Sequence, residues 1–132
     1  MTNEAKQVAT EFLNAVQQIN TEKIGLLLHP DVIWSQPGNN SISGIKQSSA
    51  EVFQMVGNMF ELSANTLKLA EIKSITVNSN KVACLLSWKA VKPSGEVLDV
   101  DNIDEYTVED GKITHVEVFT ADEAQEDKFW AK

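Results

Sequence analysis

The residue best suited to acid–base chemistry in this sequence is Asp104, which lies in the strand-like segment Val100–Phe119. Side chains alternate along a β-strand, so Asn102, Asp104, Tyr106 and Val108 share one face. Tyr106 and Val108 are typical inward-facing residues, and we therefore expect Asp104 to share an apolar environment. A carboxylate there raises its pKa or finds a partner. Asp104 is thus a candidate general acid or base; the alternative is an acid that lies at a strand edge in water or accepts a structural hydrogen bond.

Three large aromatic residues fall on three different predicted strands: Trp34, Trp88 and Tyr106. Together with Asn102 and Asp104 they could line an apolar pocket with a few polar anchors, which is the usual composition of a small-molecule site. The alternative is ordinary core packing.

The remaining reactive residues are weaker candidates. His115 suits general base catalysis near neutral pH, although an outward or structural histidine is commoner. His29 precedes a proline at a predicted helix end, and we interpret it as structural. These two separated histidines do not form a metal site, so we expect neither metal nor cofactor. Cys84 lies in an apolar run and is predicted to be a buried, inert thiol. The acidic residues Asp122, Glu123, Glu126 and Asp127 are predicted to form a solvated helix face.

Composition limits the classes of protein to which this chain could belong. With 132 residues, it is predicted to form a single domain, residues 1–132. Its net charge is −8, and all of its basic residues are lysines, with no arginine. A nucleic-acid partner is therefore not expected, because phosphate recognition needs a concentrated basic face. The N-terminus lacks a secretion signal, and no apolar run approaches the roughly 20 residues needed to cross a bilayer. We expect a soluble, cytoplasmic protein without a membrane partner.

The first half of the chain has the periodicity of helices. Apolar residues recur at helical spacing near the N-terminus, at Val8, Phe12, Val16 and Ile19. A second, short helix is expected after Asn20 or Thr21, ending at His29-Pro30-Asp31. Val32–Trp34 is predicted to be a short strand. A third helix is expected after Ser43-Gly44, with one apolar stripe formed by Ile45, Ser49, Val52, Phe53, Val56, Met59 and Phe60.

The second half changes to strand-like segments: Leu67–Val77, Lys81–Val91, Val97–Val108 and Lys112–Thr120. Asp110-Gly111 supplies the positive-φ positions of a tight hairpin between the last two. Residues Ala121–Trp130 are predicted to form a C-terminal helix. Helices followed by a run of strands indicate an α+β fold, in which a curved antiparallel sheet wraps the helices and leaves a concave space.

The sequence resembles the nuclear transport factor 2-like superfamily, whose fold is cystatin-like, and within it the SnoaL-like and ketosteroid-isomerase-like branch. The resemblance rests on the helix–helix–strand opening, the loop from Trp34 through Gln36-Pro37-Gly38 to Ser43-Gly44, and the hairpin Asp104-x-Tyr106…Asp110-Gly111-Lys112-Ile113. It implies a cone-shaped α+β barrel with a pocket between sheet and helices. It also implies a homodimer formed through the outer sheet face, which agrees with apolar residues on both alternating sets of the last strand.

The resemblance also implies catalytic positions, and here the sequence departs from the ketosteroid isomerases. Gln36 stands where they carry a carboxylate base, and an amide cannot accept the proton. Phe12 stands where they carry a tyrosine, so no hydroxyl donates to an oxyanion. A limonene-epoxide-hydrolase-like site would need an arginine, which the chain lacks. SnoaL-like cyclases are a better analogy, because an acid on the late strand acts there as general acid or base.

Two hypotheses remain open at this point. The first is a pocket protein that binds a small apolar molecule. In its enzymatic form it is an isomerase or cyclase that acts on a carbonyl compound through Asp104, with His115 as a weaker catalytic candidate. The second is a non-catalytic dimeric binding or scaffold domain. The residues predicted to contact a ligand are Phe12, Trp34, Gln36, Phe60, Trp88, Asn102 and Tyr106.

Overall fold

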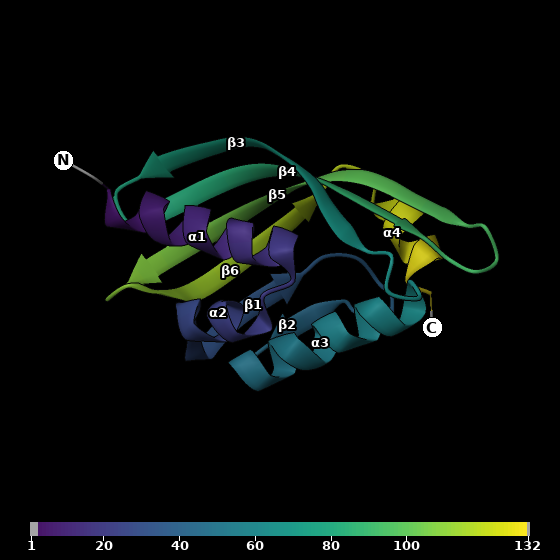
Figure 1. Cartoon of the computed structure of the whole chain (residues 1–132), viewed down its shortest axis with the longest axis horizontal. Helices are drawn as coiled ribbons and strands as arrows, with labels where there is room; N and C mark the ends of the chain where they lie inside the picture. Colours follow the sequence, from purple (N-terminus) through teal and green to yellow (C-terminus); the bar gives the residue numbers. More distant parts are fainter. Residues whose placement is uncertain (1–2, 132) are drawn as a thin grey trace.

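Two helices open the chain in the computed structural model, which describes residues 3–131. Helix α1 spans Glu4–Gln18 and helix α2 spans Thr21–Leu27 (Figure 1). The side chain of Asn20 accepts a hydrogen bond from the backbone of Lys23 and so caps α2. The predicted apolar stripe of α1 faces the core except at its end, because Ile19 is the C-cap residue and is 53% exposed.

Strand β1 is longer than predicted. It spans Leu28–Gln36 and begins directly after α2, so the predicted helix end at His29-Pro30-Asp31 is wrong by a few residues. Pro30 cannot donate a ladder hydrogen bond, and the pairing of β1 shifts register between Leu28 and Ile33, where Pro30 lies. The strand therefore includes the proline that the sequence predicts to lie at the helix end.

The third helix also begins later than predicted. Residues Gly44–Lys46 form a short edge strand, β2, and α3 spans Ser49–Leu62. Ser48 sets this start, because its side chain accepts a hydrogen bond from the backbone of Glu51. Ile45 consequently does not belong to the apolar stripe of α3; it lies in β2 and is 63% exposed.

The four later strands agree closely with the prediction. They are β3 (Lys68–Asn78), β4 (Lys81–Val91), β5 (Val97–Glu109) and β6 (Lys112–Thr120). Asp110 and Gly111 both have positive φ, 50° and 76°, as a tight hairpin requires. The chain continues into helix α4, Glu123–Phe129.

The strands form one curved sheet in the order β2-β1-β6-β5-β4-β3. It is mixed rather than wholly antiparallel, because β1 pairs with β6 in parallel. Hairpins force antiparallel neighbours, but β1 reaches β6 only after α3 and the β3–β5 meander, which serve as the crossover a parallel pair needs. The expected α+β architecture with helices against one sheet is otherwise present.

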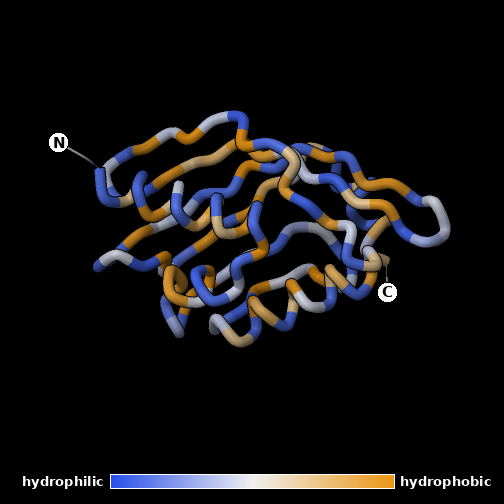
Figure 2. The backbone as a smooth tube through the Cα atoms, in the orientation of Figure 1, coloured by the Kyte–Doolittle hydropathy of each residue, from blue (hydrophilic) through white to orange (hydrophobic). Residues whose placement is uncertain are grey.

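The helices lie along the sheet, and the core lies between them. Figure 1 shows α1 across strands β3–β6, α2 and α3 beside β1 and β2, and α4 at the far end. Inward residues alternate with outward ones along β5, which Figure 2 shows as changing colours along the tube. Among residues 3–131, no helix is both long and apolar enough to cross a membrane.

Candidate functional site

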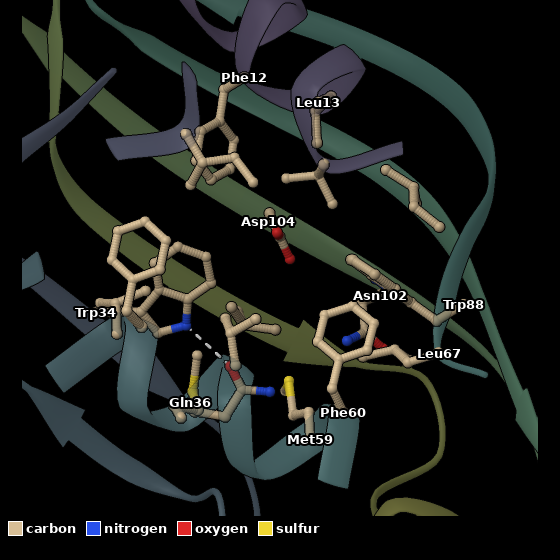
Figure 3. A pocket seen from close by; sticks show the side chains of 18 of the residues that line it. Phe12, Leu13, Trp34, Gln36, Met59, Phe60, Leu67, Trp88, Asn102 and Asp104 are labelled. Carbon is tan, nitrogen blue, oxygen red and sulfur yellow. Dashed lines mark hydrogen bonds between the residues drawn. The ribbon is translucent and has the colours of Figure 1, made fainter. Parts of the chain in front are cut away.

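A cavity of about 120 Å³ lies between the helices and the inner face of the sheet. Its walls are mainly apolar side chains from α1, α3 and the strands, and Figure 3 shows them surrounding the carboxyl group of Asp104. The structure brings eight of the nine sequence-predicted site residues to this cavity: Phe12, Trp34, Gln36, Phe60, Trp88, Asn102, Asp104 and Tyr106.

Asp104 and Tyr106 form a buried pair on β5. They are two residues apart on the inward face, and their exposed fractions are 4% and 0%. The Tyr106 hydroxyl donates a hydrogen bond of 2.8 Å to Oδ2 of Asp104. None of the described residues gives a hydrogen bond to the other carboxyl oxygen, Oδ1. The pair therefore presents one fixed and one free carboxyl oxygen to an apolar cavity.

This environment changes the protonation of Asp104. Burial raises its pKa to about 7, since the charged form loses the solvation of water; the Tyr106 hydrogen bond opposes this rise, and the negative charge of Glu126 adds to it. Burial also raises the pKa of Tyr106, which remains a neutral hydrogen-bond donor. Asp104 can accordingly give or accept a proton near neutral pH.

The neighbouring aromatic residues hold this pair in place. The ring of Phe12 meets the Tyr106 ring edge-on at 5.5 Å and lies 6.4 Å from the Trp34 ring. The indole Nε1 of Trp34 donates a hydrogen bond of 2.9 Å to Oε1 of Gln36. Gln36 is thus engaged with Trp34, and Phe12 contributes only an apolar surface.

The other end of the cavity lies near Asn102, Trp88 and Phe60. Figure 3 shows Asn102 beside Trp88 and Leu67, with Phe60 of α3 facing them. Trp88 and Phe60 are partly buried. Asn102 is 5% exposed, and the described residues provide no hydrogen bond to its Oδ1. This oxygen is thus a second unpartnered hydrogen-bond acceptor in the cavity wall.

His115 lies on the other face of the sheet. It is exposed, and its ring contacts Thr114 rather than the cavity. An irregularity in the pairing of β5 with β6, after Thr107, separates it from Ile113, which faces the core. Strict alternation would put these two residues on one face, and the irregularity puts them on opposite faces. The geometry offers His115 no route to the ligand cavity.

The site contains one acid that the sequence predicts to be exposed to solvent. Glu126 of α4 lines the cavity and is 5% exposed, whereas its neighbour Glu123 is exposed. Burial raises the pKa of Glu126, the side chains of Thr120 and Trp130 oppose this, and the nearby charges of Asp127 and Asp122 add to it. The signal was its spacing: Glu126 precedes the buried Phe129 and Trp130 by three and four residues, which puts it on their face of the helix.

Helix α4 is fixed in position by the loop that follows β1. Oδ1 of Asp127 accepts hydrogen bonds from the Asn39 backbone and the Asn40 side chain, both at 2.8 Å. The carbonyl of Trp130 accepts hydrogen bonds from the Ser41 backbone and hydroxyl at 3.0 and 2.6 Å. These contacts hold the inner face of α4 against the cavity.

The cysteine of β4 and the histidine at the start of β1 lie outside the Asp104–Tyr106 pair. Cys84 is buried opposite Asp104 on β4, and burial, with a smaller contribution from the Asp104 charge, raises the pKa of its thiol to about 12. This protonated thiol is a poor nucleophile. Within the part of the chain that the structure describes, no three His, Cys, Asp or Glu side chains cluster as metal ligands. His29 accepts a hydrogen bond from the Asp31 backbone in β1.

Comparisons with known proteins agree on the fold. Residues 9–116 match the SnoaL-like domain. A protein of unknown function with a cystatin-like fold from Xanthomonas campestris is 34% identical, with 97% of this chain and 98% of that chain covered and a TM-score of 0.92. No curated protein is significantly similar in sequence.

Two more distant structures share the fold. TerC, which was co-crystallised with polyporic acid, is 18% identical over 96% of this chain and 98% of its own, with a TM-score of 0.83. A candidate SnoaL-like polyketide cyclase from Jannaschia sp. CCS1 is 16% identical over 98% and 93%, with a TM-score of 0.77. At these identities the likeness concerns the fold and not the chemistry of the site.

Proposed function

Because this chain belongs to the SnoaL-like domain family, we propose that it binds a small, mainly apolar carbonyl compound and moves a proton on it through Asp104. The observation that carries the proposal is the free Oδ1 of Asp104, which is buried in an apolar cavity while Tyr106 holds the other oxygen. An acid kept near its point of half-ionisation at neutral pH suits isomerase or cyclase chemistry.

The proposed reaction begins with a ligand whose C–H bond next to a carbonyl faces Oδ1 of Asp104. The carboxylate accepts that proton and leaves an enolate. The enolate then takes the proton back from Asp104 at another carbon, which completes an isomerisation, or attacks a carbonyl carbon of the same molecule, whose oxygen takes up the proton from Asp104. Tyr106 keeps Oδ2 in place, so the free oxygen is the one that exchanges protons. The apolar walls exclude water and so protect the intermediate.

A second candidate function is ligand binding without turnover. Two observations favour it. The side-chain oxygen of Gln36 accepts a hydrogen bond from Trp34, and Phe12 has no hydroxyl group, so two parts of a ketosteroid-isomerase-like site are missing. In this case Asp104 would serve as a polar anchor for the ligand. TerC, which shares the fold and was co-crystallised with polyporic acid, supports ligand binding by this fold in either case.

The test is to identify what the cavity holds. We expect native mass spectrometry of the purified protein, or a crystal soaked with a mixture of one-ring ketones, to reveal a bound compound of a size suited to about 120 Å³. A cavity of similar volume is known to bind benzene. Narrowing the cavity with Leu13→Trp should abolish binding, whereas Leu26→Trp on the exposed face of α2 should not. Equal binding by both variants would contradict this location of the site.

We also propose that the chain forms a homodimer through the outer sheet face. An apolar stripe crosses three strands there, because Leu85 pairs with Ile103 and Ile103 pairs with Phe119. Ile103 and Phe119 are 44% and 49% exposed. Two ion pairs lie beside the stripe, Lys73 with Asp101 and Lys81 with Glu105. The surface thus carries both positive and negative charges, which suits contact with a second copy of the same surface.

The dimer prediction is tested by sedimentation. The wild-type protein is expected to sediment at twice 14.6 kDa at micromolar concentration. Phe119→Lys should give the monomer, because a charge in the middle of an apolar interface is poorly solvated. The equally apolar but distant Leu26→Lys serves as the control. A wild-type protein that sediments only at 14.6 kDa would refute the proposal.

A further inference from the structure

Three buried side-chain oxygens at the cavity lack a hydrogen-bond donor within the described part of the chain. They are Oδ1 of Asn102, Oδ1 of Asp104 and Oε2 of Glu126, and each residue is at most 5% exposed. Asn102 and Asp104 are neighbours on the inner face of β5, and α4 packs against β5. Because a buried acceptor without a donor costs free energy, this group of oxygens is suited to a ligand that donates.

The charges around the cavity restrict the ligand further. Among residues 3–131, its lining contains two acids, Asp104 and Glu126, and a single basic residue, Lys68, which is exposed. Asp122 and Asp127 add negative charge beside Glu126. A carboxylate or phosphate at this end of a ligand would meet like charges in a poorly solvated space, where their repulsion is stronger than in water.

We propose that the ligand is uncharged and carries a hydroxyl group, which donates a hydrogen bond to Glu126 or Asn102. This inference rests on the proposed function and adds the substrate class: a neutral hydroxycarbonyl compound whose carbonyl-bearing part lies at Asp104. Glu126 is then the residue that selects against anionic ligands, and α4 carries this selectivity. It does so without taking part in proton transfer at Asp104.

The test compares three probes that share one methylated ring: toluene, p-cresol and p-toluate. Their binding is measured by calorimetry or by ligand-observed NMR at pH 8 with the full chain. The wild-type protein is expected to bind p-cresol more tightly than toluene, and p-toluate at least about tenfold more weakly than p-cresol, since tenfold corresponds to a modest like-charge repulsion. Glu126→Gln should narrow the gap between p-cresol and p-toluate. Glu123→Gln, which alters an exposed acid of the same helix, should preserve it.

The possible results separate the two proposals. If all three probes bind with similar affinity, the apolar cavity of the proposed function stands and the selectivity for a hydroxyl group is refuted. If p-toluate binds as tightly as p-cresol, or if Glu126→Gln leaves their ratio unchanged, the role of Glu126 is refuted. If none of the probes binds, both proposals fail. The wild-type ratios test the inference even if Glu126→Gln does not fold.

Discussion

The variant Asp104→Asn is expected to lose roughly 10²–10⁴-fold of the proton-transfer activity, which is the usual contribution of a positioned general acid or base. Asparagine keeps the shape of the side chain and an oxygen that can accept from Tyr106, but it cannot take up a proton. The activity can be measured as exchange of the α-protons of phenylacetone for deuterium in D₂O, followed by NMR. This probe has one ring and one carbonyl group, as the cavity requires.

The pH dependence of this exchange gives a second measure. The carboxylate is the form that removes a proton, so the protein-catalysed rate should rise with pH and level off above about 7, the pKa of Asp104. Exchange caused by buffer and hydroxide is subtracted with a protein-free sample. Asp99→Asn, an exposed acid on the same strand, should retain the wild-type profile. Undiminished exchange in Asp104→Asn would leave ligand binding without turnover as the function.

The second large effect concerns stability. The pKa of Asp104 is about 7 in the folded chain against an ordinary 3.8, so between these values the folded state keeps a proton that the unfolded state has lost. The free energy of unfolding therefore falls as pH rises through this window. The full loss above pH 7 is about 4 kcal/mol, because each pKa unit corresponds to about 1.4 kcal/mol. Asp104→Asn removes this loss and should be more stable than the wild type at pH 8.

Urea denaturation at pH 5 and pH 8 measures this difference. The stability of Asp104→Asn relative to the wild type should increase between the two pH values, while Asp99→Asn should follow the wild type at both. Glu126 remains in all three proteins, so its own raised pKa largely cancels in the comparison. If the difference in stability between Asp104→Asn and the wild type is the same at pH 5 and at pH 8, water reaches Asp104 in the folded state.

Most of the strands could be predicted because their signals are local. The Asp110-Gly111 turn and the alternation from Asn102 to Val108 depend only on neighbouring residues, and the structure agrees with both. The parallel pairing of β1 with β6 could not be predicted in this way, since no hairpin joins the two strands. The same limit applies to Ile45. It lies at helical spacing from the apolar residues of α3, but Ser48, three residues later, caps the helix and fixes its start after Ile45.

The candidate site shows a similar division. Sequence reasoning placed Asp104 on an inward strand face, because period-two alternation is strict within an uninterrupted strand. Sequence reasoning favoured an outward His115, which is exposed, but it could not foresee the irregular pairing after Thr107 that separates His115 from the buried Ile113. It failed for Glu126 because an acidic run is usually solvated, and charge outweighed the helical spacing to Phe129 and Trp130 in the prediction. A charged residue on the apolar side of a short helix therefore merits attention as a site candidate.

The two acids of the cavity lie on different elements, Asp104 on β5 and Glu126 on α4, and this affects how such a cavity can change in evolution. Asp104 and Tyr106 belong to a central strand that pairs on both sides, so their geometry is fixed by the whole sheet. Glu126 belongs to a seven-residue helix that packs against β5, buries Phe129 in the core and is hydrogen-bonded to the loop after β1. Substitutions of Glu126 can change which ligand is accepted and leave the Tyr106–Asp104 hydrogen bond in place, but they also remove a charge that raises the pKa of Asp104. Ligand selectivity and the pKa of the reactive acid are therefore coupled through the charge of Glu126, so a change in one can alter the other.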